Sequence, residues 1–291
     1  MNLNNNEIID FFKHYGFPYP DISNYDADKI IKTIKNNKDI IDKNGNIEFG
    51  SSAGNNILLT FFPHFFDAYK EGGHSAKWYF ENKLEHILND IKKYSNKYPT
   101  ISLVRSYLIE HERISGFRPV IAKQIYDKYC NENTIMLDPC GGWGGRLLGA
   151  YCSDKIKRYD CLEASLLSYK SLIEVKKYFD NLIKGKQINI NYGCYEESKF
   201  ENEFYDLIFT SPPYFCKEHY SDDEMQSCNK YHNYNEWKNG FLYKFIENSY
   251  NYLKLNGYFI VNIDDVKIKG IKYKLENDFI EICKKFNFEL I

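Results

Sequence analysis

The sequence predicts an α/β protein in which a doubly wound, mostly parallel sheet follows a helical N-terminal region. From about residue 115, short apolar runs alternate with helix-like segments, which is typical of a parallel sheet. Residues 1 to about 100 instead show mostly helical spacing and carry no phosphate loop. The 291 residues, 43% of them hydrophobic, suffice for one large or two modest domains. We therefore expect a helical accessory region over residues 1–105 and an α/β domain over residues 106–291.

In the N-terminal region, we expect helices over residues 5–15, 26–38 and 75–94. A turn is predicted at Asn44-Gly45-Asn46. The run from Ile57 to Phe66 is an aromatic cluster broken by Pro63. Two interpretations stay open for this region: a cap packed on the α/β domain, or a cap that also helps to bind substrate.

In the α/β half, five strands alternate with helices. The predicted strands cover residues 134–138, 158–163, 187–191, 205–210 and 257–263. The predicted helices cover residues 146–152, 165–179, 237–253 and 278–286. Residues 288–291 resemble the start of a further strand. The domain is therefore expected either to lack a final strand or to be a piece of something longer.

Charge and cysteine usage exclude several classes of protein. The formal net charge is −2, so a nucleic-acid partner would need a local basic face. Eight cysteines are scattered without a Cys-x-x-Cys pair, which favours reduced thiols in a cytosolic protein. The polar N-terminus has no signal-peptide pattern, and no run of about 18 apolar residues predicts a membrane span. We expect a cytoplasmic protein without a membrane partner.

The most informative segment is the turn Ser211-Pro212-Pro213-Tyr214, which follows directly on a predicted strand. Consecutive prolines cannot continue a strand, and they donate no backbone hydrogen bonds. The turn therefore presents carbonyl oxygens, a hydroxyl and an aromatic ring at the carboxyl end of a strand. Open α/β sheets bind their ligands at that edge. Acceptors beside a stacking ring suit a planar molecule that carries an amino group.

A glycine-rich loop follows the first predicted strand and opens a helix, with the sequence Asp138-Pro-Cys-Gly-Gly-Trp-Gly-Gly145. Its glycines let the backbone turn sharply and approach a ligand closely. The loop lacks both the dinucleotide spacing and the Gly-Lys-Ser/Thr ending of a phosphate loop. Glu163 closes the second strand, where an acid can bind both ribose hydroxyls, and so it favours a nucleoside ligand.

Together these segments, over about residues 112–265, resemble the amino-methylating S-adenosylmethionine-dependent DNA methyltransferases. That family has an Asp-Pro glycine loop, an acid after the second strand, and a Ser/Asn/Asp-Pro-Pro-Tyr/Trp turn after the fourth. Gly116-Phe-Arg-Pro119 is similar to the family's extra motif, which supports the methionine end of the cofactor. The resemblance implies a Rossmann-like methyltransferase sheet with S-adenosyl-L-methionine as cofactor. The implied cofactor-binding residues are Phe117, Arg118, Pro119, Asp138, Pro139, Gly141, Gly142, Gly144 and Glu163.

The sequence departs from this family in two places. The segment Tyr192–Glu197 lacks the aspartate that often lies near the cofactor's adenine, so Glu196 or the backbone is expected to substitute. No long target-recognition domain follows the proline turn. The insert Phe215–Trp237 is the main candidate for that role, with help from the N-terminal region.

Two further patterns can be explained either by a binding function or by ordinary loop and surface composition. Cys216-x-x-His219 and Cys228-x-x-x-His232 have spacing that a zinc ion could use, but the usual paired-cysteine knuckle is missing. We therefore expect no metal site. Four lysines near the sheet edge are expected either to meet phosphates or to form solvated surface. They are Lys267, Lys269, Lys272 and Lys274.

The resemblance implies methyl transfer to the exocyclic amine of a flipped DNA base. The Ser211 hydroxyl and the Pro212 carbonyl would accept the amine hydrogens, Pro213 would keep the turn rigid, and Tyr214 would stack on the base. Serine at the first position favours N4 of cytosine over N6 of adenine by family resemblance. Methylation of RNA or of protein glutamine also stays open, as does a non-catalytic nucleic-acid-binding module. The resemblance also suggests a restriction-modification role.

Overall fold

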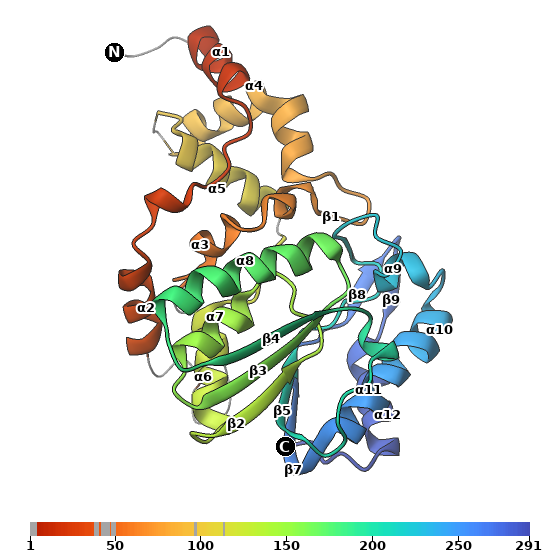
Figure 1. Ribbon diagram of the computed structural model, residues 1–291. Helices are drawn as coiled ribbons and strands as arrows, with labels where there is room; N and C mark the ends of the chain where they lie inside the picture. The colour runs from red at the N-terminus through yellow and green to blue at the C-terminus, as the bar shows by residue number, and fades with distance from the viewer. Residues whose placement is uncertain (1–4, 38–40, 42–46, 48–50, 96–97, 113) are drawn as a thin grey trace.

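The computed structural model describes residues 5–37, 41, 47, 51–95, 98–112 and 114–291 (Figure 1). The predicted turn at 44–46 lies outside them. A five-stranded sheet forms the centre of the C-terminal half, with strand order β4-β3-β2-β5-β7 and parallel pairing throughout. This confirms the predicted doubly wound, Rossmann-like fold. The strands are β2 (Thr134–Asp138), β3 (Ile156–Glu163), β4 (Gln187–Tyr192), β5 (Tyr205–Thr210) and β7 (Leu253–Val261).

Side-chain alternation along the strands divides the interior into two hydrophobic clusters, one on each face of the sheet. In β2, Met136 belongs to one cluster and its neighbour Leu137 to the other. In β5, Phe209 and Ile208 divide in the same way. Helices α6 (Pro119–Tyr129), α7 (Gly145–Cys152) and α8 (Leu166–Leu182) contribute to the first cluster, and α11 (Tyr243–Tyr252) and α12 (Leu275–Lys285) contribute to the second (Figure 1).

Most predicted elements are present, with shifted ends. The helix predicted over residues 237–253 is divided into α10 (Tyr234–Trp237), the π-helical turn η4 (Lys238–Leu242) and α11. The strand predicted over residues 288–291 is wrong. The chain turns at Asn287, where φ is 59°, and Phe288 then packs its ring 5.3 Å from that of Phe259. Partial burial of this ring against the second hydrophobic cluster takes the place of strand pairing.

The N-terminal region is helical, as predicted. It contains α1 (Asn5–Tyr15), α2 (Ala27–Asn36), α3 (Asn55–Leu59), α4 (Ala76–Ser95) and α5 (Ile101–Glu112). Ile34 and Phe62, both fully buried, belong to the same cluster as Met136 of the central sheet. Helix α2 contacts both α6 and α7. The hydrophobic core of this region is therefore continuous with one face of the sheet.

A small two-stranded sheet also joins the N-terminal region to the insert. Strand β1 (Tyr69–Lys70) pairs antiparallel with β6 (Glu218–His219), which lies just after the proline turn. Glu71 is then hydrogen-bonded to the His219 ring at 2.5 Å and forms an ion pair with Lys269 at 2.9 Å. Lys269 lies between β8 (Val266–Ile268) and β9 (Ile271–Tyr273), a hairpin that the sequence did not predict. Residues 69–71 therefore tie the insert and the hairpin to the N-terminal region.

None of the helices in the described ranges is both long and apolar enough to cross a membrane.

Candidate active site

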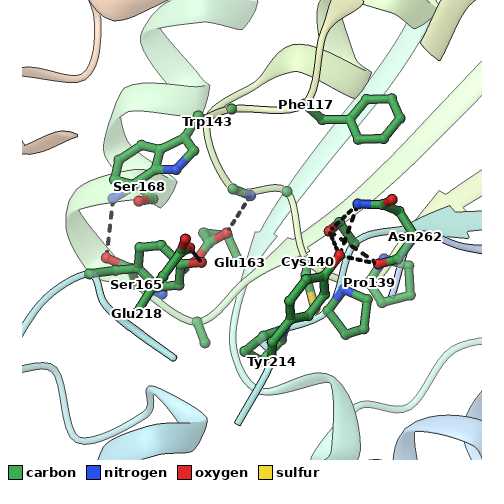
Figure 2. Close-up of a pocket in the computed structure, with 18 of the residues that line it drawn as sticks. Phe117, Pro139, Cys140, Trp143, Glu163, Ser165, Ser168, Tyr214, Glu218 and Asn262 are labelled. Carbon is green, nitrogen blue, oxygen red and sulfur yellow. Dashed lines mark hydrogen bonds between the residues drawn. The ribbon is translucent and has the colours of Figure 1, made fainter. Parts of the chain in front are cut away.

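A pocket of about 660 Å³ opens at the carboxyl edge of the central sheet (Figure 2). The whole turn from Ser211 to Tyr214 lines it, so all four predicted catalytic residues meet there. Seven of the ten predicted cofactor residues also line this pocket, namely Phe117, Arg118, Pro139, Gly141, Gly142, Glu163 and Glu196. Pro119, Asp138 and Gly144 lie outside its lining. The structure thus joins five separate sequence segments, from Phe117 to Tyr214, in one pocket.

Asp138 lies beneath the glycine loop with a fully buried carboxylate. One oxygen accepts hydrogen bonds from Arg146 Nε at 2.8 Å and the Tyr159 hydroxyl at 2.6 Å. The other accepts from Thr210 Oγ1 at 2.8 Å and the Cys140 amide at 3.3 Å. These contacts connect β2 to β3, β5 and α7. Both carboxylate oxygens of Asp138 are thus used by protein groups, so its role is to hold the glycine loop in position rather than to contact a ligand.

The glycines allow the loop to fold tightly over this carboxylate. Gly142 and Gly144 have φ angles of 55° and 76°, in the left-handed region that favours glycine. Gly145 opens α7 so close to the preceding segment that an added Cβ would lie 1.7 Å from the Phe117 carbonyl oxygen. A side chain at Gly145 cannot be accommodated without moving Phe117, whose ring lies beside the pocket (Figure 2).

Glu163 lies at the end of β3, only 8% exposed, on the pocket wall. Its carboxylate accepts the amide hydrogens of Gly142 at 2.7 Å and Ser165 at 2.8 Å (Figure 2). Burial raises the pKa of Glu163 to about 7, although the two amides oppose that shift. The acid is therefore held in place by the glycine loop itself, with its protonation balanced near neutral pH.

Glu196 lies in the turn after β4, where the sequence predicted a substitute for the missing aspartate. Its Oε1 accepts hydrogen bonds from Lys230 Nζ at 2.9 Å and the Tyr231 hydroxyl at 3.2 Å. Its side chain is only 5% exposed. Glu196 thus lines the pocket while its carboxylate serves as an anchor for the insert.

The proline turn is closed by Asn262, a residue that the sequence analysis did not single out. The Tyr214 hydroxyl donates to the Asn262 carbonyl at 2.9 Å, and Asn262 Nδ2 donates back to that hydroxyl oxygen at 2.9 Å. The same amide donates to Ser211 Oγ at 3.2 Å (Figure 2). Asn262 directly follows β7, which pairs with β5, so the sheet brings it to the turn. Its position at the end of a predicted strand was the available signal.

An aromatic wall faces the proline turn across the pocket. Trp143 of the glycine loop contacts the rings of Phe65 and His64 from the N-terminal region, with centroids 5.0 and 5.3 Å apart. His64 Nε2 also lies 3.1 Å from Ser168 Oγ of α8. Burial lowers the pKa of His64 to about 4, so this imidazole is neutral at physiological pH. The N-terminal region therefore supports this aromatic wall as well as packing on the sheet. It also contributes Asn55 and Lys70 directly to the pocket lining.

Both cysteines and one of the two histidines of the insert have side-chain partners within the protein. The Cys216 thiol donates to the Cys228 carbonyl at 3.7 Å, and the Cys228 thiol donates to Asn229 Oδ1 at 3.6 Å. His219 pairs with Glu71. Across the described part of the chain, no group of three or more His, Cys, Asp or Glu side chains is arranged to hold a metal ion.

Residues 205–289 match the family model described as DNA methylase, which is less than a third of the 291 residues. A comparison with curated proteins gave no match. Among solved structures, the YcgJ protein from Bacillus subtilis is 14% identical, with a TM-score of 0.34 and coverage of 47% of each chain. Geranyl diphosphate C-methyltransferase from Streptomyces coelicolor A3(2) is 9% identical, with a TM-score of 0.39 and coverage of 70% of this chain and 63% of that one. The matched regions thus span less than two thirds of those two proteins.

The Rossmann-like sheet, the pocket at its carboxyl edge and the DNA methylase match together support a methyltransferase. The family match starts at β5 and includes the proline turn, the insert and Asn262. It therefore covers the half of the pocket in which the acceptor amine is expected.

Proposed function

We propose that this chain is an S-adenosyl-L-methionine-dependent DNA amino-methyltransferase whose target is N4 of cytosine. One observation carries the proposal: the proline turn and the glycine loop with Glu163, far apart in sequence, line one pocket. The match of residues 205–289 to the DNA methylase family supports DNA as the substrate.

The residues present fit the cofactor. The cavity of about 660 Å³ is in the range of small-molecule sites. Glu163 provides a carboxylate for the ribose hydroxyls, and Gly141 and Gly142 bring backbone close to the ligand. Phe117 and Arg118 would support the methionine end. When bound, S-adenosyl-L-methionine supplies an electrophilic methyl group on a sulfonium.

The proline turn then activates and places the acceptor. An exocyclic amine is a weak nucleophile because its lone pair is delocalised into the ring. Ser211 Oγ and the Pro212 carbonyl oxygen would accept the two amine hydrogens and pull the nitrogen toward tetrahedral geometry. Asn262 donates to Ser211 Oγ at 3.2 Å and so fixes its position. The Tyr214 ring would stack on the base, so the contribution of the turn is placement and electrostatics.

Serine at the first position of the turn supports cytosine through the family resemblance, with adenine as the second candidate because both bases offer an exocyclic amine. A duplex substrate would have its target base flipped into the pocket. The N-terminal region and the insert would hold the surrounding DNA.

Transfer of labelled methyl from S-adenosyl-L-methionine to unmethylated amplified DNA tests the proposal, with RNA and protein as parallel acceptors. We expect label in DNA and loss of transfer in Tyr214→Ala, while calorimetry shows cofactor affinity within a few-fold of the wild type. Label only in RNA or protein, or no cofactor binding by the wild type, contradicts it.

A further inference from the structure

Residues 225–227 of the insert line the part of the pocket beside β4, and we call this segment the roof. The Cys194 thiol, just after β4, donates to the Met225 carbonyl at 3.4 Å. Asp223 accepts the Leu166 amide hydrogen at 3.0 Å and so anchors the insert to the start of α8. Trp237 Nε1 donates to Ser227 Oγ at 3.3 Å beneath this segment. The roof is therefore fixed at both ends and from below.

Gln226 stands out among the side chains of this roof. It lines the pocket, and only 8% of it is exposed. Its backbone carbonyl accepts hydrogen bonds from the amides of Asn229 and Lys230. Its side-chain amide, by contrast, has no hydrogen-bond partner among the residues that the structure describes. A side chain that is nine-tenths buried beside a cavity, and whose amide has no protein partner, points to a ligand in that cavity.

The order of the strands indicates which end of a nucleoside would reach this amide. The sheet runs β4-β3-β2-β5, with the reactive turn after β5 and Glu163 after β3. If Glu163 holds the ribose, the base lies on the far side of Glu163 from the turn, beside β4. That end is lined by Gly193, Glu196 and Gln226. Oε1 of Glu196 already accepts hydrogen bonds from both Lys230 and Tyr231, which hold this carboxylate toward the insert.

We propose that Gln226 recognises the adenine of the cofactor, in the role for which the sequence suggested Glu196. A glutamine amide has one acceptor and two donors, and it matches adenine's amino group and an adjacent ring nitrogen bidentately. The insert thereby selects an aminopurine nucleoside as well as bordering the acceptor site. This inference rests on the proposed use of S-adenosyl-L-methionine.

The test is calorimetric binding of S-adenosylhomocysteine and of its deaminated analogue, S-inosylhomocysteine, which presents an oxygen in place of the amino group. We expect the wild type to favour the first about tenfold, because a site built to bind an amino group leaves its own polar group unpaired with the analogue. Gln226→Leu should bind S-adenosylhomocysteine about tenfold more weakly and should bind both ligands within about twofold of each other.

Gln187→Leu is the matched control, since Gln187 is exposed at the start of β4 and lies outside the pocket lining. It should keep the wild-type preference. If melting curves show that Gln226→Leu is not folded, Gln226→Met provides a side chain of similar length without hydrogen-bonding groups. Undiminished discrimination in the folded variant overturns the role of Gln226 alone. Failure of the wild type to bind S-adenosylhomocysteine overturns the proposed function with it.

Discussion

The Tyr214 hydroxyl and Asn262 are joined by two hydrogen bonds of 2.9 Å, one to the backbone carbonyl and one from the side-chain amide. Tyr214 belongs to the turn after β5, and Asn262 follows the neighbouring strand β7. The pair fixes the aromatic ring at the pocket by its polar end. The hydroxyl is thereby engaged, and Lys217 Nζ lies over one face of the ring, 5.1 Å from its centroid, so a base would stack on the opposite face.

Substitutions at Tyr214 should separate these two contributions. Tyr214→Phe keeps the ring and loses the hydrogen bonds to Asn262. We expect kcat/KM for methyl transfer to DNA to fall by the equivalent of about 0.5–1.5 kcal/mol of transition-state stabilisation. Tyr214→Ala also removes stacking, which is worth about 1–3 kcal/mol per base. Steady-state kinetics measures both. Equal losses in the two variants would contradict a stacking role for the ring.

Asp138→Ala should destabilise the fold rather than simply remove a cofactor contact. It leaves Arg146, 4% exposed, without its carboxylate partner, and breaking a buried ion pair costs about 3–5 kcal/mol. Denaturant unfolding measures the change. Glu174→Ala is the matched control, because it breaks a surface pair with Lys177 and should cost no more than about 1 kcal/mol. Equal stability of the two variants would show that Asp138 does not hold the loop.

Cofactor affinity should rise with pH through about 7. The pKa of Glu163 is raised to about 7 by burial, and ribose hydroxyls donate to the ionised carboxylate. Calorimetry between pH 6 and 8 should show tighter binding of S-adenosylhomocysteine at the higher pH, and Glu163→Gln should remove this slope. A wild-type affinity that is flat over this range counts against Glu163 as the ribose ligand.

The same group predicts the sign of a stability change. The folded protein binds the Glu163 proton more tightly than the unfolded chain does, because the folded pKa lies above the usual 4.5. Glu163 therefore makes the unfolding free energy fall as pH rises from about 4.5 to about 7. Glu163→Gln should remove that contribution in unfolding experiments across the range. A difference between wild type and variant that stays constant with pH would contradict the raised pKa.

Gly145→Ala should disturb the pocket through Phe117. The new Cβ would meet the Phe117 carbonyl oxygen at 1.7 Å, and overpacking of this kind costs about 1–3 kcal/mol or more. Thermal unfolding and cofactor calorimetry should show lower stability and weaker binding. Gly116→Ala is the milder comparison, since its nearest neighbour is a Trp143 side-chain atom at 3.3 Å. A Gly145→Ala protein as stable as Gly116→Ala would contradict this close approach.

The parts of the fold that depend on local pattern were predictable. The strand ending at Asp138 and the strand before Ser211 have the predicted bounds, because each is a short apolar run closed by a turn signal. The lysine-rich hairpin β8–β9 was missed, since alternating lysines indicated solvated surface. In the structure, Lys269 binds Glu71 and Lys272 binds Asp265.

The parts of the site that depend on tertiary contacts were not predictable. Asn262 and Gln226 belong to segments without a chemical motif, and only the pairing of β7 with β5 and the docking of the insert on β4 bring them to the pocket. The position of Asp138 under the loop likewise follows from packing. The sequence motif marked it as important, and the structure assigns it a positioning role.

Nucleoside mass spectrometry tests the central claim most directly. DNA from cells that express the wild-type chain, or Tyr214→Ala as control, is digested to nucleosides and measured for every methylated base. We expect N4-methylcytosine with the wild type and none with the variant. Methyl groups on adenine N6 alone would replace the target base, and DNA without any additional methylated nucleoside would contradict the proposed function.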